Sequence, residues 1–347
     1  MKPIILTVDY ELFLGNQTGT VEKCMIEPTY KLAEILDINH SKMTVFWDIL
    51  HYRRLIELEN DFPEIKNDKT LIDKQISFLI SKGHDIQLHL HPHWLDAAYT
   101  DGKWNFNYEH FKIHSLSEED DPKNINTIIG CISITKQLME REVRKYLPDY
   151  KVTTFRAGGY LVEPFTKLKK AFEQNNIFID SSVLPGISNF NNIFSYNFSE
   201  YHDNNLYHFD ESPSEKSLEG KFIEIPITTL SIPGYKNLEY TLLRRIKYND
   251  LESGRMGTGS GEAVTNNKKS LLSKIISSIS KPKIAALTTD GNFKEKLNYM
   301  LYKVKNNSMM ILHSKLLNSH TLNILKDKLL KNEIKFISIN NFLKGIE

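Results

Sequence analysis

Two acidic residues follow the first apolar segment of the chain. Asp9 and Glu11 stand two positions apart after the run Ile4–Val8. Residues two apart on an extended chain point the same way, so both carboxylates could face one cavity. Two carboxylates so close repel each other unless a cation lies between them. The pair therefore indicates either a cation site or a solvated acidic turn.

Four histidines occur within ten residues, from His84 to His93. His89 and His91 would share one face of an extended segment, and Pro92 cannot easily continue it. A bend at Pro92 would let His93 swing back toward His89, which gives a His-x3-His pair. Imidazole nitrogens suit zinc, cobalt or nickel. This density of histidines favours a metal site over surface histidines.

Three more apolar runs end in an ionisable residue. Arg156 leaves its run just before a Gly-Gly pair, and it would need a carboxylate partner, for which Asp9 is the obvious choice. Asp180 and His313 also follow apolar runs. Each residue alone is equally compatible with a structural role. Their recurrence at the ends of separate apolar runs indicates one shared site.

The apolar runs are expected to be strands that alternate with helices. The expected strands are Ile4–Asp9, Met43–Trp47, Asp85–Leu90, Val152–Arg156, Ile177–Ser181, Phe222–Ile227, Met309–His313 and Phe336–Ile339. The expected helices are Tyr30–Ile38, Thr70–Ser81, Ile125–Tyr146, Pro164–Asn175, Phe293–Lys305 and Ser319–Leu330. This alternation predicts a parallel sheet, open or closed into a barrel. Sites in such folds form at the carboxyl ends of the strands.

Length and composition set the remaining expectations. The 347 residues are expected to form one domain, residues 1–347, with loop-rich insertions at about 187–221 and 253–269. Charge is nearly balanced, with 44 basic and 43 acidic residues, which gives no reason to expect a nucleic acid as partner. No apolar stretch is long enough to span a membrane, and the N-terminal one is too short for a signal peptide. The chain is therefore expected to be cytoplasmic.

The order of these motifs resembles the polysaccharide deacetylases, also called the NodB-homology fold or carbohydrate esterase family four. The matching segments are Thr7–Glu11, Gly83–His93, Phe155–Tyr160, Asp180–Val183 and Ile311–His313. The resemblance spans nearly the whole chain, and the histidine segment is its most specific part. It implies a distorted (β/α) barrel of about seven parallel strands. It also implies a hydrolase that removes N-acetyl groups from sugars with a divalent metal ion, zinc or else cobalt or nickel.

The resemblance also implies a role for each site residue. Glu11, His89 and His93 would bind the metal, although the spacing of the first motif leaves open whether Asp9 or Glu11 is the acidic ligand. In the family the first motif commonly has adjacent aspartates, and here Tyr10 fills the second position.

The remaining roles concern proton transfer. Asp9 would be the general base, oriented by Arg156. His313 would be the general acid, steadied by Asp180. The expected substrate is an N-acetylated sugar or glycan precursor, made inside the cell for a surface polysaccharide such as capsule or O-antigen.

Two alternatives stay open. An amidohydrolase-like metal hydrolase would use a His89-x-His91 pair, although that motif normally closes the first strand. A carbohydrate-binding module without turnover would need no general acid, so the acid, base and metal candidates argue against it.

Overall fold

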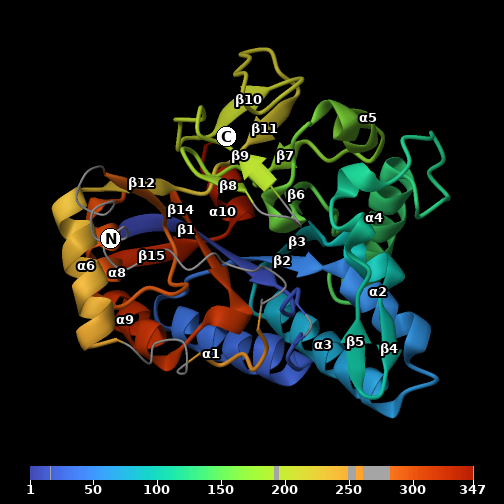
Figure 1. Ribbon diagram of the computed structural model, residues 1–347, viewed down its shortest axis with the longest axis horizontal. Helices are drawn as coiled ribbons and strands as arrows, with labels where there is room; N and C mark the ends of the chain where they lie inside the picture. The colour runs from blue at the N-terminus through green and yellow to red at the C-terminus, as the bar shows by residue number, and fades with distance from the viewer. Residues whose placement is uncertain (16, 191–194, 249–254, 261–281, 347) are drawn as a thin grey trace.

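A curled, mainly parallel sheet forms the centre of the computed structural model, which describes residues 1–15, 17–190, 195–248, 255–260 and 282–346 (Figure 1). The strand order is β10-β11-β7-β6-β3-β2-β1-β14, and β15 also pairs with β1. Every pairing in this sheet is parallel except that of β10 with β11. The strands are β1 (Lys2–Tyr10), β2 (Thr44–Asp48), β3 (Asp85–Leu90), β6 (Thr154–Ala157), β7 (Ile179–Asp180), β10 (Tyr207–Phe209), β11 (Phe222–Glu224), β14 (Ser308–His313) and β15 (Ile334–Ile337).

The sheet curls so far that the segment after β11 forms hydrogen bonds both to the chain just after β7 and to β14, at the other edge of the sheet. Ile227 donates its backbone N–H to Val183 just beyond β7, at 2.9 Å. Thr228 donates its N–H to the carbonyl of Met309 in β14 at 3.1 Å, and the Met309 N–H donates to Thr228 Oγ1 at 2.8 Å. These bonds close the barrel without a regular strand, so the predicted distorted (β/α) barrel is confirmed. All eight expected strands are present.

Helices cover the outside of the curled sheet (Figure 1). They are α1 (Glu27–Leu36), α2 (Ile49–Leu58), α3 (Pro63–Ser81), α4 (Ile128–Arg144), α5 (Thr166–Gln174), α6 (Gly234–Ile246), α8 (Lys294–Lys303), α9 (Ser319–Leu330) and α10 (Ile339–Lys344). The six predicted helices correspond to α1, α3, α4, α5, α8 and α9, whereas α2, α6 and α10 are additional. The N-terminus of α4 shows how local sequence sets a boundary, since the Thr127 side chain accepts a hydrogen bond from the Gly130 N–H at 2.9 Å.

The insertions are built from short hairpins and loops. The region 187–221 contains the hairpin β8 (Ser188–Phe190) and β9 (Ser195–Asn197) before β10. A further hairpin pairs β4 (Ala98–Thr100) with β5 (Lys103–Asn105), and β12 (Thr229–Ile232) pairs antiparallel with β13 (Lys283–Ala286), which follows α6. Of the second predicted insertion, 253–269, only residues 255–260 belong to the described part of the chain. They lie against the site end of the barrel, because Gly257 donates its N–H to the carbonyl of Lys315.

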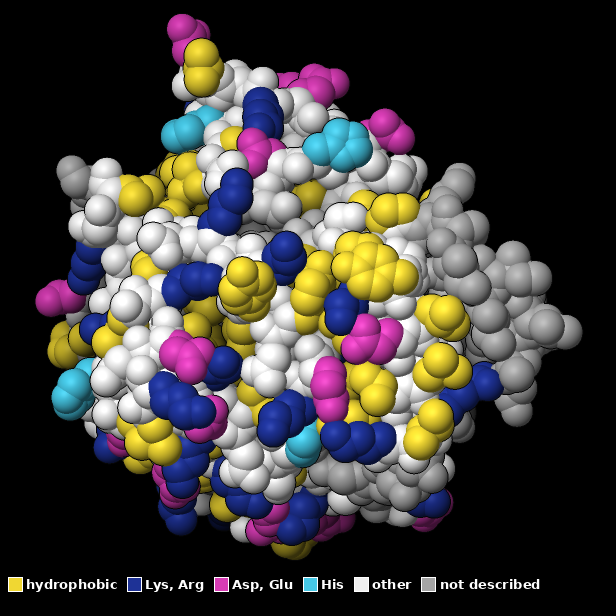
Figure 2. Space-filling model, turned by 90° about the vertical axis from the view of Figure 1, so that its left-hand side faces the viewer, with side chains coloured by type: hydrophobic (Ala, Val, Ile, Leu, Met, Phe, Trp, Pro, Cys, Tyr) yellow, Lys and Arg dark blue, Asp and Glu magenta, His cyan; other side chains and the backbone are white. Residues whose placement is uncertain are grey.

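Helices α6 and α8 form one lateral face, where hydrophobic side chains are interleaved with Lys, Arg and acidic residues (Figure 2). Tyr240 of α6 packs on Phe293, just before α8, in a small separate hydrophobic cluster. Tyr235, Ile246 and Tyr302 project outward and are 68%, 81% and 79% exposed. Among the described residues, no helix combines the length and hydrophobicity required to cross a bilayer.

We expect Thr228→Val to lower the free energy of unfolding by about 1–3 kcal/mol, because the buried Met309 N–H would lose its acceptor. Urea unfolding followed by circular dichroism measures the change. Thr70→Val, on the exposed surface of α3, is the matched control and should change stability far less. Equal stability of the Thr228 variant and the parent chain would contradict the proposed closure.

Candidate active site

The carboxyl ends of β1, β3, β6 and β14 meet at one end of the barrel, and ionisable side chains gather there. All are nearly inaccessible to solvent except His313, whose side chain is 19% exposed. The group consists of Asp9, Glu11, His89, His91, Arg156, His313 and Lys315. Buried charges are retained in proteins only where they are paired or bind an ion, so this group is a candidate active site.

Three side chains converge closely enough to hold a metal ion. Glu11 Oε2 lies 2.5 Å from His91 Nε2 and 3.3 Å from His89 Nε2, and the two Nε2 atoms are 3.1 Å apart. The three ligand atoms lie within 4.8 Å of one another. One carboxylate oxygen and two imidazole nitrogens form a donor set that suits zinc and similar divalent ions. The residues therefore fit the metal that the motifs imply.

The ring of His89 is held in the orientation that a metal ligand needs. Its Nδ1 lies 2.9 Å from the backbone carbonyl of Arg156, to which it can donate, and this leaves the Nε2 lone pair facing the cluster. Burial lowers the pKa of His89, but the hydrogen bond to Glu11 and the charge of Asp9 outweigh it and raise the pKa to about 9. The surroundings of this nitrogen thus favour positive charge.

Glu11 is fixed on its other side by a lysine. Lys315 Nζ lies 2.7 Å from Glu11 Oε1 and donates to the carbonyl of Leu12, also at 2.7 Å. Burial would raise the pKa of Glu11, but Lys315 and His91 hold it well below its ordinary value. The carboxylate therefore stays ionised and keeps Oε2 directed at the histidines. Lys315 was not expected at the site from the sequence, where its position two residues after His313 is the signal that could have found it.

His93 does not join the cluster, and His91 stands where His93 was expected. Pro92 begins a 3-10 turn, Pro92–Asp96, that carries the next residue away from Glu11. The His93 ring instead stacks on Phe111, with centroids 5.5 Å apart, and neither of its nitrogens has a hydrogen-bond partner among the described residues. Burial holds the pKa of His93 well below its ordinary value, so the ring is neutral. The two-residue alternation of β3 extends to His91, and the bend comes after it.

Gly158 makes room for His91. A Cβ atom at this position would lie 2.6 Å from His91 Nδ1 and 2.3 Å from the carbonyl oxygen of Leu90, both far inside contact distance. The Gly-Gly pair after Arg156 therefore serves the close approach of β6 to the histidine segment.

Arg156 pairs with Asp9, as the sequence predicts. Its Nη1 donates to Asp9 Oδ1 at 2.6 Å, and its Nε donates to the carbonyl of Ser181 at 2.7 Å. The guanidinium also lies over the ring of Phe46, 4.0 Å from its centroid, and is wholly buried. Burial raises the pKa of Asp9, but Arg156 and the nearby histidines lower it below its ordinary value. Asp9 is thus an ionised carboxylate whose Oδ2 is not used by Arg156.

His313 is steadied by Asp290, not by Asp180. His313 Nδ1 lies 2.7 Å from Asp290 Oδ2, and its Nε2 lies 3.5 Å from Asp9 Oδ2. Burial lowers the pKa of His313, but Asp290 and then Asp9 raise it above its ordinary value. Sequence reasoning missed Asp290, although it follows the apolar run Ile284–Leu287 in the way the other site residues follow theirs.

Asp180 lies apart from His313 because of strand alternation. Ser181 faces the barrel interior, where its hydroxyl contacts Arg156, so the preceding Asp180 points the other way. Asp180 accepts hydrogen bonds from the Ser182 hydroxyl at 2.8 Å and the Ser182 N–H at 3.0 Å. Burial raises the pKa of Asp180 and of the adjacent Glu224. A structural role fits these contacts.

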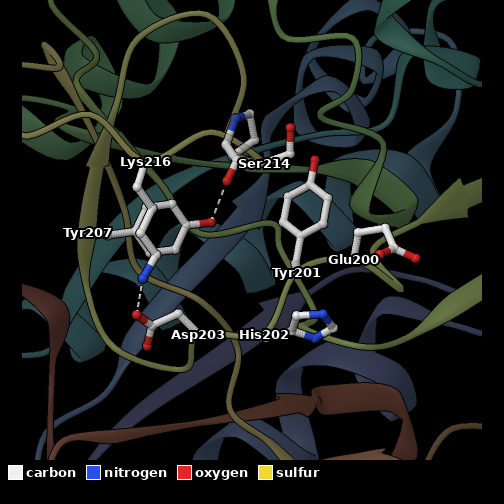
Figure 3. Close-up of a pocket in the computed structure, with 8 residues that line it drawn as sticks. Glu200, Tyr201, His202, Asp203, Tyr207, Ser214 and Lys216 are labelled. Carbon is white, nitrogen blue, oxygen red and sulfur yellow. Dashed lines mark hydrogen bonds and ion pairs between the residues drawn. The ribbon is translucent and has the colours of Figure 1, made fainter.

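A pocket of about 450 Å³ opens on the insertion that contains β10, separate from this group (Figure 3). Several of its polar side chains contact one another or nearby groups: Lys216 pairs with Asp203, Tyr207 donates to the carbonyl of Pro213, and Tyr201 donates to Glu163. None of the residues that line it belongs to the strand-end group. We therefore place the chemistry at the strand ends.

We expect Gly158→Ala to weaken binding of zinc or cobalt at least tenfold, because the added methyl displaces the His91 ring. Isothermal titration calorimetry on the metal-free chain measures the affinity. Gly130→Ala is the control for disturbance of the fold away from the site, because a Cβ on Gly130 in α4 would collide with the carbonyl of Asn124, and the folded variant should bind metal as the parent chain does. A Gly158 variant that binds metal as tightly as the parent chain would show that His91 is no ligand.

Comparison with known proteins gives matches among solved structures alone. No protein-family model matches the chain, and no curated protein matches it. A family 4 carbohydrate esterase from Streptomyces lividans, solved with acetate, is 9% identical, with a TM-score of 0.38 over 96% of this chain and 91% of that one. A peptidoglycan N-acetylglucosamine deacetylase is 13% identical, with a TM-score of 0.35 over 98% and 86%.

A third match is the 4-alpha-glucanotransferase from Thermococcus litoralis, at 10% identity and a TM-score of 0.46, which covers 99% of this chain and 38% of that one. A fold does not by itself imply a reaction, so chemistry must be argued from the side chains. The solved structures that this chain is similar to include carbohydrate esterases and deacetylases, the kind of protein its motifs resemble, together with an enzyme named for another reaction.

Proposed function

We propose that this chain is a metal-dependent hydrolase of the polysaccharide deacetylase type, which removes an N-acetyl group from a sugar. The observation that carries the proposal is the meeting of three units in one buried site. A Glu–His–His cluster, a carboxylate paired with arginine, and a histidine paired with aspartate all lie within hydrogen-bond or ion-pair reach of one another.

Glu11, His89 and His91 would hold the metal ion, with His91 in the role first expected for His93. When bound, a divalent ion polarises the acyl carbonyl and lowers the pKa of water toward about 7. The Lys315–Glu11 pair and the bond from His89 to the Arg156 carbonyl keep two of these ligands oriented before the ion arrives.

Asp9 would act as the general base. Arg156 fixes its Oδ1 and keeps it ionised, while Oδ2 can accept the proton of the attacking water. Because Arg156 is held by Ser181 and Phe46 as well, the base has one orientation, and little reorganisation is needed during reaction.

His313 would act as the general acid. An amide nitrogen must be protonated to leave, whereas an alkoxide needs this less, so an acid with a raised pKa favours an amide substrate over an ester. His313 Nε2 lies 3.5 Å from Asp9 Oδ2, which supports the proposal that acid and base serve one reacting group.

The substrate we propose is an N-acetylated sugar, in the form of a precursor of a surface polysaccharide. We expect Tyr160, in the turn after β6, to contact it, since the charges of Asp9 and Arg156 act on its hydroxyl. Burial raises the pKa of Tyr160 well above its ordinary value, so the hydroxyl stays protonated and can donate to the substrate. Trp94 and Trp104 pack on each other in the core, which leaves them unsuited to stack on a sugar.

A second candidate is an amidohydrolase-like metal hydrolase, which the pairing of His89 with His91 favours. The position of that pair on β3, with carboxylates after β1, fits the deacetylase better. Acetate release from N-acetylated sugars is the activity that the deacetylase proposal requires, and a metal hydrolase acting on other amides would not release it from these substrates.

We expect Asp9→Asn and His313→Ala each to reduce turnover by roughly 10² to 10⁴-fold, the usual loss for a general base or acid. The measurement is acetate release from a panel of N-acetylated sugars, free and nucleotide-linked. Asp96→Asn, at a partly exposed carboxylate paired with His110, is the matched control and should keep near-normal turnover. EDTA should abolish activity, and activity that survives it would exclude a labile metal.

We expect Asp290→Asn to shift the alkaline limb of the pH–rate profile to lower pH. Asp290 raises the pKa of His313, and the acid form is lost as pH rises through that pKa. Removing the carboxylate lowers the pKa, so activity is lost at lower pH. The profile of kcat against pH tests this, and an unshifted limb would assign the acid to another group.

A further inference from the structure

Asp48 is a buried carboxylate that lacks the partners such a group requires. It is the last residue of β2 and is fully inaccessible to solvent. Neither of its oxygens has a hydrogen-bond partner among the described residues. A buried carboxylate without partners is costly, so an observed one calls for a ligand or a cation.

The register of the sheet places Asp48 level with the residues of the metal cluster, at the carboxyl ends of the strands. Asp48 pairs with His89 across β2 and β3. Tyr10 pairs with Trp47 across β1 and β2, so Glu11 and Asp48 are the next residues along the two chains. Adjacent strands lie about 4.8 Å apart, and residues paired in a parallel ladder share a face. Asp48 therefore lies between two members of the cluster.

Asp48 also does not cap the helix that follows it. It occupies the N-cap position of α2, where an aspartate commonly accepts a hydrogen bond from a backbone N–H, yet its side chain makes no capping bond. Burial raises the pKa of Asp48 to about 6, while the charges of His91 and then His89 are the largest effects that oppose the rise. The carboxylate thus lies in the field of the two cluster histidines.

We propose that Asp48 supplies a fourth protein ligand to the divalent ion held by Glu11, His89 and His91. This rests on the proposed metal-dependent function. The divalent ion would supply Asp48 with the cation that Lys315 supplies to Glu11, which removes the cost of burying two acids side by side. A five-coordinate ion would keep one position for water.

The test is metal binding by the purified chain, freed of metal with a chelator. Calorimetric titration with zinc gives the affinity, and titration with cobalt gives the d–d absorption spectrum of the bound ion. We expect Asp48→Asn to weaken zinc binding at least tenfold and to change the cobalt spectrum. Asp85→Asn is the matched control: Asp85 is also buried, but it lies at the opposite end of β3 and is hydrogen-bonded to Thr44 and Gln87. It should change neither.

Each outcome separates this inference from the proposed function. If the parent chain binds neither ion, the proposed function fails. If the parent chain binds metal and Asp48→Asn matches it in affinity and spectrum, Asp48 is no ligand and the proposed function stands. Weaker binding with an unchanged spectrum places Asp48 outside the coordination sphere and overturns the inference. Should Asp48→Asn not fold, Asp48→Glu keeps the charge and is expected to alter the spectrum; an unaltered spectrum counts against ligation.

Discussion

The buried negative charge at the end of β1 is the constraint on which the rest of the site depends. Asp9 and Glu11 are removed from water two residues apart, and each keeps its charge only because the barrel supplies a cation to it. Arg156 serves Asp9 from β6, and Lys315 serves Glu11 from the turn after β14. Side chains from β6, which lies across the sheet from β1, and from the turn after the neighbouring strand β14 thus complete one electrostatic unit.

Because of these ion pairs, the two carboxylates are suited to different roles. Each cation contacts one oxygen of its acid and leaves the second oxygen to meet other side chains of the group. At Glu11 the second oxygen meets two imidazoles, which is a metal-binding arrangement. At Asp9 it meets His313, which Asp290 holds by its other nitrogen, an arrangement suited to moving protons. The motif alone leaves open which acid binds metal, and the placement of Lys315 and Arg156 favours Glu11.

The sequence predicted the strands and the Arg156–Asp9 pair because both follow from local pattern: apolar runs define strands, and a buried arginine needs a carboxylate. It could not predict which histidine follows His89 into the cluster, because that depends on where the backbone bends. Pro92 indicated the bend, but the 3-10 turn that begins at Pro92 directs His93 away from Glu11. The contact between Asp290 and His313 could not be predicted either, because it depends on a bridge between distant segments, Thr288 with Ile311.

The most direct test of the account is a crystal structure of the protein with zinc or cobalt, with anomalous diffraction data collected at the absorption edge of the metal. The account predicts one anomalous peak at about 2.0–2.3 Å from Glu11 Oε2 and from the Nε2 atoms of His89 and His91. A peak bound by His93, or no peak between these three side chains at saturating metal, would contradict it.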